Sequence, residues 1–198
     1  MSEKSAYPAF WDERYQSQIL PWDAGEVPIE FIAFAQTLTP TIQVLIPGCG
    51  SGYEVGYLAE AGVSVLGIDF SPVAVAHAQT ILGQHAQHLH CTDFFALPST
   101  PFDWVYERAF LCALPRSRRI DWAQKMTQLI KPGGVLAGYF FIADTESGPP
   151  FGLAAGELAT LLGTAFVCEQ DQPCMQSSAV FAFTGSERWQ VWRRVIGL

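Results

Sequence analysis

A glycine-rich loop after an apolar run is the part of this sequence best suited to chemistry. The run Val44–Ile46 has strand character, and Gly48 and Gly50 follow it in a G-x-G-x-G pattern. Glycine lets a backbone pass close to a ligand and adopt angles that a Cβ would forbid. Such a loop also presents the ligand to the positive end of the helix that follows. We therefore expect a ligand at this loop.

An acid follows at the spacing expected for a nucleoside site. Asp69 lies about 20 residues after Gly48, at the end of a second apolar run, where a carboxylate can accept hydrogen bonds from ribose hydroxyls. Tyr53 stands where the dinucleotide fingerprint requires its third glycine. The spacing favours S-adenosylmethionine over a nicotinamide dinucleotide. The remaining alternative is a strand–helix turn that binds no ligand.

Histidine and cysteine could supply metal or nucleophilic chemistry, but the sequence favours neither. The four histidines, between His77 and His90, and the neighbouring Cys91 lack an accepted zinc-ligand spacing. Cys49 lies inside the glycine loop with no histidine beside it, so its small side chain is explained by the space available there. We expect no metal and no cysteine nucleophile.

Alternating elements must position the loop and the acid. Helical periodicity predicts helices at 8–18 and 27–37. Further helices are expected near 52–61, 71–83, 116–130 and 154–162, and strands near 42–46, 63–69, 87–92, 102–107, 134–142, 164–170 and 188–195. The alternation predicts a parallel sheet covered on both faces, with the ligand at the carboxyl ends of the central strands. The last two strands have no clear helix between them, which predicts an inserted antiparallel strand.

Composition limits the class of protein and its partners. The 198 residues suit one domain, and acids outnumber bases 19 to 11, for a net charge of −8. A protein that grips phosphate backbones needs a basic face, so nucleic acid is not an expected partner. The N-terminus lacks the apolar core of a signal peptide, and no apolar run reaches membrane-spanning length. We therefore expect no membrane partner. The odd count of five cysteines indicates reduced thiols in a cytoplasmic protein.

Several segments together resemble one family of class I S-adenosylmethionine-dependent methyltransferases, the thiopurine S-methyltransferase family, with its thiol and halide methyltransferase branch. Most other methyltransferases carry an acid where Ile46 stands, so this departure supports the resemblance. The matching segments span about residues 10 to 195: Phe10–Tyr15, Pro21–Gly25, Leu45–Gly50 with Pro47, Phe102–Leu114, Leu129–Gly134 and Gly148–Phe151.

The resemblance implies a fold and a set of site residues. The expected fold is α/β, a Rossmann-like seven-stranded mixed sheet with helices on both faces. A helical N-terminal lid at 8–37 would cover a core at 41–198, within one methyltransferase domain, 1–198. Arg108 would face the reaction centre as the catalytic residue. The cofactor S-adenosylmethionine would be contacted by Trp11, Tyr15, Trp22, Gly48, Gly50, Asp69, Phe70, Asp93 and Phe94.

Some of these residues have a structural alternative. Trp11 and Tyr15 are four apart on one helix face, so they could fill the domain's own core instead of covering a cofactor. Asp93 could be a turn aspartate. Arg108 could instead form a structural salt bridge. Its neighbour Glu107 points to the opposite face of the strand, so these two residues need not pair with each other.

The resemblance also bears on the acceptor. Arg108 stands where the plant halide-methylating branch has a tyrosine and thiopurine-methylating members have arginine, which favours sulfur acceptors. We therefore expect methyl transfer from S-adenosylmethionine to a small soft nucleophile, a thiol, thiopurine or other chalcogen anion. The alternatives are a halide methyltransferase and a catalytically silent module that binds S-adenosylmethionine.

Overall fold

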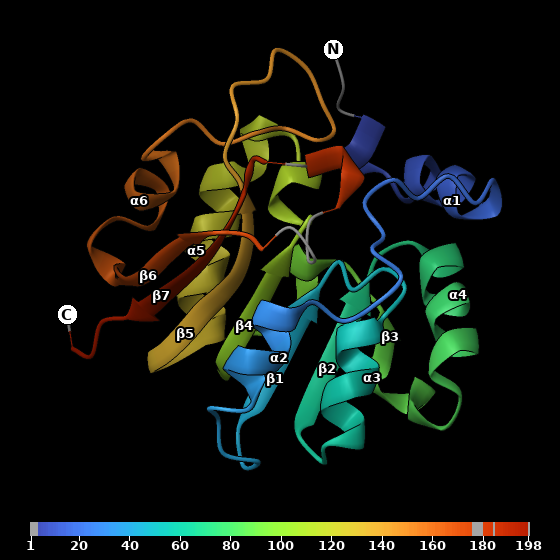
Figure 1. Cartoon of the computed structure of the whole chain (residues 1–198), viewed down its shortest axis with the longest axis horizontal. Helices are drawn as coiled ribbons and strands as arrows, with labels where there is room; N and C mark the ends of the chain where they lie inside the picture. Colours follow the sequence, from blue (N-terminus) through green and yellow to red (C-terminus); the bar gives the residue numbers. More distant parts are fainter. Residues whose placement is uncertain (1–3, 176–179, 184, 198) are drawn as a thin grey trace.

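The computed structural model describes residues 4–175, 180–183 and 185–197, which pack around one seven-stranded sheet (Figure 1). The strand order is β3-β2-β1-β4-β5-β7-β6. In chain order the strands are β1 (Gln43–Pro47), β2 (Ser64–Asp69), β3 (Leu89–Cys91), β4 (Phe102–Arg108), β5 (Ile130–Phe141), β6 (Phe166–Pro173) and β7 (Glu187–Arg194). Strands β1 to β5 pair in parallel, whereas β7 pairs antiparallel with both β5 and β6. The predicted mixed sheet with its last strand inserted antiparallel is confirmed.

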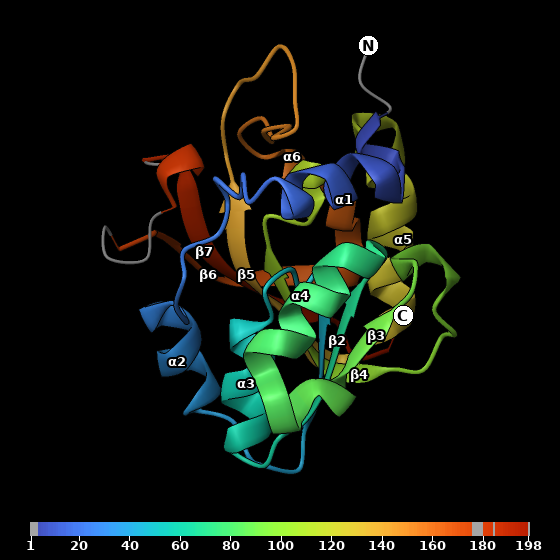
Figure 2. The same ribbon diagram turned by 90° about the vertical axis from the view of Figure 1, so that its right-hand side faces the viewer.

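Helices cover both faces of the sheet (Figure 2). They are α1 (Pro8–Gln16), α2 (Ile29–Ala35), α3 (Tyr53–Glu60), α4 (Pro72–Leu82), α5 (Arg119–Leu129) and α6 (Glu157–Leu162). Apolar side chains of α2, α3 and α4 share one buried cluster with the sheet, built around Phe31 and Trp104. Those of α5 and α6 share the cluster on the opposite face, around Trp122 and Leu158. Burial of these two apolar surfaces holds the three layers together.

The N-terminal segment divides into two parts with different positions. Helix α1 lies beyond the carboxyl ends of the strands (Figure 1), whereas α2 packs on a face of the sheet. Phe31 of α2 is fully buried, with its ring 5.1 Å from that of Trp104 and 4.7 Å from that of Tyr106. The expectation that all of 8–37 forms a lid is therefore corrected, because α2 belongs to the core.

Two other boundaries differ from the sequence expectation. The residues 131–133, which fall between the expected helix at 116–130 and the expected strand at 134–142, lie within β5, which begins directly after α5 at Ile130. The ladder with β4 is irregular there, and a Cβ on Gly134 would lie 2.9 Å from the Asp103 carbonyl oxygen, so only glycine fits this bulge. The expected strand at 87–92 is shorter, because a 3₁₀ helix occupies Gly83–His88.

Candidate active site

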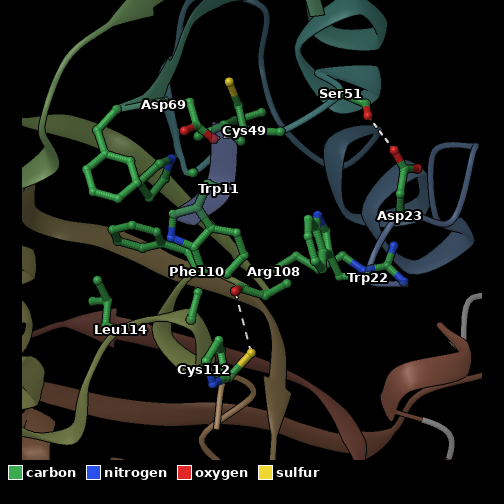
Figure 3. Close-up of a pocket in the computed structure, with 18 of the residues that line it drawn as sticks. Trp11, Trp22, Asp23, Cys49, Ser51, Asp69, Arg108, Phe110, Cys112 and Leu114 are labelled. Carbon is green, nitrogen blue, oxygen red and sulfur yellow. Dashed lines mark hydrogen bonds between the residues drawn. The ribbon is translucent and has the colours of Figure 1, made fainter. Parts of the chain in front are cut away.

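One cavity of about 390 Å³ opens at the carboxyl ends of β1, β2 and β4 (Figure 3). All ten residues that the sequence singled out for the site are among its lining residues: Trp11, Tyr15, Trp22, Gly48, Gly50, Asp69, Phe70, Asp93, Phe94 and Arg108. They come from the N-terminal segment and from the ends of four strands or the loops that follow them. The fold therefore brings together residues that are up to about a hundred positions apart, at the edge where parallel α/β sheets bind their ligands.

The glycine loop is shaped by left-handed backbone at Gly48 and Gly50, whose φ angles are +59° and +53°. A Cβ on Gly48 would lie 2.6 Å from the Phe110 ring, and one on Gly50 would lie 2.8 Å from the Tyr15 hydroxyl. The backbone amide of Cys49 donates to the carbonyl of Ile68 at 2.9 Å, which ties the loop to the end of β2. Glycine is thus required by both conformation and space.

Asp69 is held in place at the end of β2 by two backbone amides. Gly50 N donates to Oδ2 at 3.3 Å, and Ser71 N donates to Oδ1 at 2.9 Å. Burial raises the pKa of Asp69 to about 6, although these amide hydrogen bonds oppose the rise. The carboxylate is thus a fixed acceptor beside the glycine loop.

Three aromatic side chains form what we call the aromatic cover, defined as Trp11, Tyr15 and Trp22. The rings of Trp11 and Trp22 meet edge to face at 5.2 Å, and Tyr15 lies 6.2 Å from Trp22. Tyr15 is buried against His77 of α4, with ring centroids 5.7 Å apart, and also lines the cavity. Tyr15 therefore packs in the protein interior, as the structural alternative expects, and also lines the cavity that would hold a cofactor.

Two aspartates of the N-terminal segment attach it to the loops below. Ser71 Oγ donates to Asp12 Oδ1 at 2.6 Å, and the same serine caps α4 by accepting from Ala74 N at 3.0 Å. Ser51, in the glycine loop, donates its hydroxyl to Asp23 (Figure 3). The sequence analysis missed both contacts, because neither partner gives a local sequence signal.

The loop after β3 places Asp93 and Phe94 at the cavity in different ways. Asp93 is exposed and caps the 3₁₀ helix Phe94–Ala96 by accepting from Phe95 N at 2.9 Å. Phe94 is buried, and its ring lies 5.1 Å from that of Phe110. The hydrogen bond of Asp93 is thus that of a turn aspartate, as the structural alternative expects. Asp93 and Phe94 both line the cavity as well.

Arg108 ends β4 between the cavity and buried partners. Its Nε lies 3.8 Å from Oε1 of Glu187, and its guanidinium carbon lies 4.6 Å from the centre of the Tyr139 ring. Arg108 therefore makes the salt bridge that was the structural alternative, and it lines the cavity as well. Glu107 does not pair with it: this carboxylate accepts from the amide of Phe110 at 3.0 Å and from that of Leu111 at 2.8 Å.

Glu54 and Tyr106 line the cavity near Arg108 and were missed by the sequence analysis. Glu54 lies in the first turn of α3, and the Tyr106 hydroxyl donates to its Oε1 at 3.1 Å. Burial raises the pKa of Glu54, and the nearby Arg108 charge opposes that rise. The sequence signal that could have pointed to Glu54 is its place four residues after Gly50, in the helix that follows the glycine loop. Other lining residues that were missed include Phe110, Cys112, Pro149, Pro150 and Phe183.

Comparison with known proteins decides what kind of site this is. A family model described as thiopurine S-methyltransferase matches residues 6–195. The chain belongs to the thiopurine S-methyltransferase family. It is 33% identical over 174 residues to a thiopurine S-methyltransferase of Vibrio cholerae, covering 78% of this chain and 80% of the relative. It is 32% identical over 169 residues to a probable thiol methyltransferase 2 of Arabidopsis thaliana, covering 82% and 74%.

Solved structures agree on the fold of this family member. An N1-methyltransferase of Burkholderia thailandensis with bound S-adenosylhomocysteine matches with a TM-score of 0.73 and 16% identity, over 95% of this chain and 87% of that one. A magnesium protoporphyrin IX methyltransferase of Synechocystis, also with S-adenosylhomocysteine, matches with a TM-score of 0.66 and 17% identity, over 92% and 82%. Its membership of the thiopurine S-methyltransferase family makes the protein an S-adenosylmethionine-dependent methyltransferase.

The residues of this cavity fit that cofactor. The left-handed glycine loop exposes backbone, Asp69 is a half-buried acceptor that two backbone amides hold in place, and the aromatic cover lies over the same cavity. A sulfonium cation is attracted to aromatic faces, and a nucleoside needs an acceptor for its ribose hydroxyls. Within residues 4–175, 180–183 and 185–197, no cluster of His, Cys, Asp and Glu could hold a metal ion, and no helix is long and apolar enough to cross a membrane.

Proposed function

We propose that this protein methylates the sulfur, or a related chalcogen atom, of a small thiol or thiopurine. The observation that carries the proposal is the continuity of the cavity, which runs from the glycine loop and Asp69 to Arg108, Glu54 and Tyr106. A donor and a small acceptor would share one partly open cavity, whose walls include several aromatic side chains. The names of the relatives, which include thiopurine, thiol and thiocyanate methyltransferases, support the same class of acceptor.

The bound cofactor would supply a methyl group that its positive sulfur already activates. The protein then needs mainly to hold donor and acceptor in line and to keep water out. Asp69 would accept from the ribose hydroxyls, and Gly48 and Gly50 would let the loop backbone approach the cofactor. The aromatic cover would exclude the water that blunts an anionic nucleophile. Asp93, Phe94 and Phe70 would border the adenine end.

Arg108 would act at the acceptor end. A guanidinium there stabilises negative charge on the attacking sulfur, and the low polarity of the cavity strengthens that attraction. Its contacts with Glu187 and Tyr139 would fix its position for this task. Arg108 would thus serve both as a structural partner in the fold and as the catalytic residue nearest the acceptor.

Methyl-transfer assays across acceptor classes test the proposal. The purified protein is incubated with S-adenosylmethionine carrying a labelled methyl group and with small thiols, thiopurines, selenols, thiocyanate or iodide. Turnover on sulfur or selenium acceptors above iodide supports the proposal. Preference for iodide would make the protein a halide methyltransferase. Tight cofactor binding by calorimetry without turnover on any acceptor would make it a silent binding module.

We further propose a small-molecule acceptor, not nucleic acid, and a cytoplasmic location. The net charge of −8 disfavours phosphate backbones. All five cysteines are free, which suits a reducing compartment. Incubation with labelled cofactor and total RNA or DNA should leave the nucleic acid unlabelled, and cell fractionation should recover the protein with cytoplasmic markers.

A further inference from the structure

A thiol that binds at the acceptor end of the cavity must lose its proton before or during methylation. A free thiol has a pKa of about 8.5 and is mostly protonated near neutral pH, whereas the thiolate is the nucleophile. Methylation of a protonated thiol therefore needs a group that takes the proton. The following inference rests on the proposed function, because it identifies that group within the same cavity.

The charges around Arg108 suit an acceptor that arrives neutral. Arg108 is already paired with Glu187 across 3.8 Å, and the Glu54 carboxylate also acts on its charge. An anion entering from solvent would meet one cation beside two carboxylates and would gain little. A neutral thiol would meet no such penalty, provided that its proton can be transferred inside the cavity.

The candidates for that transfer can be compared one by one. No histidine is found among the described residues that line the cavity. Asp69 and Asp93 are held by backbone amides at the loops after β2 and β3. Asp23 accepts from Ser51, and Glu26 is exposed to solvent. None of these four acids lies on β4, which carries Arg108 and Tyr106, or on α3.

Glu54 differs from the other acids in its surroundings. It lines the cavity on the first turn of α3, is fixed by the Tyr106 hydroxyl at 3.1 Å, and interacts with Arg108. The side chains that interact with it are Tyr106 and Arg108 from β4, Asp23 from the N-terminal segment, Cys49 from the glycine loop and its neighbour Tyr53. A carboxylate in this place can receive a proton while Arg108 stabilises the sulfur that loses it.

We propose that Glu54 is the catalytic base that deprotonates the acceptor thiol. The S–H bond breaks, its electron pair stays on sulfur, and the proton binds a Glu54 carboxylate oxygen. The thiolate sulfur then forms a bond to the methyl carbon as the bond between that carbon and the positive sulfur breaks. The products are a thioether, neutral S-adenosylhomocysteine and protonated Glu54, which returns its proton to solvent. Burial raises the pKa of Glu54 toward that of a thiol, which improves the match between base and acid.

The variant Glu54→Gln tests this role with two acceptors. Thiocyanate carries no proton, so its methylation should not need the base, whereas a neutral thiol should. We expect kcat/KM for the thiol to fall about 10²- to 10⁴-fold, with a change of less than about tenfold for thiocyanate. Glu60→Gln, at the exposed end of the same helix, is the matched control and should retain both activities.

A spectroscopic readout tests the same claim without turnover. An aromatic thiol with a distinct thiolate absorbance is titrated with the protein and S-adenosylhomocysteine. A carboxylate beside the sulfur disfavours the thiolate, so the bound thiol should ionise at a lower pH in Glu54→Gln, where the Arg108 charge acts on it without Glu54, than in the wild type. Calorimetry should show that Glu54→Gln binds S-adenosylmethionine as the wild type does.

Three results would overturn the role. Equal losses with thiol and thiocyanate would make Glu54 a positioning residue. Weakened cofactor binding would place it against the cofactor. A bound thiol that ionises at the same pH in the wild type and in Glu54→Gln would show that Glu54 does not face the acceptor sulfur. A wild-type protein that methylates no acceptor would instead refute the proposed function, so the two failures are distinguishable.

Discussion

Ser71 Oγ donates a hydrogen bond to the Asp12 carboxylate at 2.6 Å, which joins α1 to the residue that caps α4. Ser71 also donates its backbone amide to Asp69 at 2.9 Å. One serine therefore connects the helix over the cavity with the acid beside the glycine loop. This connection predicts that the position of α1 and the binding of cofactor depend on each other.

Removal of the Asp12 carboxylate should loosen α1 without unfolding the sheet. Ser71 would still cap α4 through Ala74, so we expect Asp12→Ala to weaken cofactor binding by up to about 1.5–3 kcal/mol, the range for one hydrogen bond to a charged group. Calorimetry with S-adenosylmethionine measures this. Glu13→Ala, the exposed neighbour on α1, is the control and should bind normally. Equal affinity in both variants would show that the contact has no part in binding.

Asp69→Ala should weaken cofactor binding by about 1–3 kcal/mol, because the ribose hydroxyls would lose a charged acceptor. Calorimetry measures the loss, and circular dichroism checks that the fold is retained. Unchanged affinity in a folded variant would make Asp69 only a residue that orders the Gly50 and Ser71 backbone.

The same acid predicts a pH dependence. Burial raises the pKa of Asp69 to about 6 in the free protein, and the ionised form is the better acceptor. Cofactor affinity should therefore hold above pH 6 and fall as the pH drops through that value. Asp69→Asn, which does not titrate, should bind more weakly but with a flat profile over this range. A wild-type profile equally flat would contradict the assignment.

Deletion of residues 1–20 should remove the helix over the cavity and leave the sheet folded. Phe31 of α2, which fills the core against Trp104, is retained in this variant. Cofactor affinity and turnover should both fall, as they should for Trp11→Ala, since the aromatic cover is lost. A thermal unfolding experiment shows whether the deletion variant is folded. A deletion variant that does not fold would show that Trp11 and Tyr15 serve mainly as core.

Glu107 should make the protein less stable at alkaline pH. Burial raises the pKa of this carboxyl to about 8, against an ordinary value of about 4.5. The folded state therefore binds the proton more tightly than the unfolded state, and stability is lost as the pH rises from about 4.5 to about 8. Glu107→Gln should show a smaller loss over this interval in thermal unfolding. An unchanged pH slope would contradict the assignment.

Arg108→Ala should reduce kcat/KM more for thiols and thiocyanate than for a neutral thioether acceptor. A charge-assisted contact to an anionic sulfur is worth more than a contact to a neutral one. Cofactor affinity should stay nearly unchanged in calorimetry. Equal losses for charged and neutral acceptors would assign Arg108 to the Glu187 salt bridge alone.

The sequence predicted the parts of the site that depend on local patterns. The glycine loop, Asp69 and the alternation of strands and helices follow from turn chemistry and periodicity within short windows. The family resemblance added the positions of Trp11, Asp93 and Arg108, and all of them line the cavity. Their roles in binding and catalysis remain predictions.

The missed features depend on contacts between distant residues. Glu54 meets Tyr106 only because α3 packs on the sheet face from which Tyr106 projects, and an acid in a first helical turn is ordinary by itself. Asp12 meets Ser71 only when α1 lies over α4. Likewise, periodicity identifies α2 as amphipathic without saying which apolar surface it covers. Tertiary packing determines these contacts, and short sequence windows do not record it.

The most direct test follows the methyl group itself. The protein is mixed with S-adenosylmethionine labelled in its methyl carbon and with a small thiol, and products are identified by mass spectrometry. The account predicts that the label appears in the thioether, in a one-to-one ratio with S-adenosylhomocysteine, and that Glu54→Gln slows this transfer. Binding of S-adenosylmethionine without any labelled thioether, across thiols, thiopurines and selenols, would contradict the central claim.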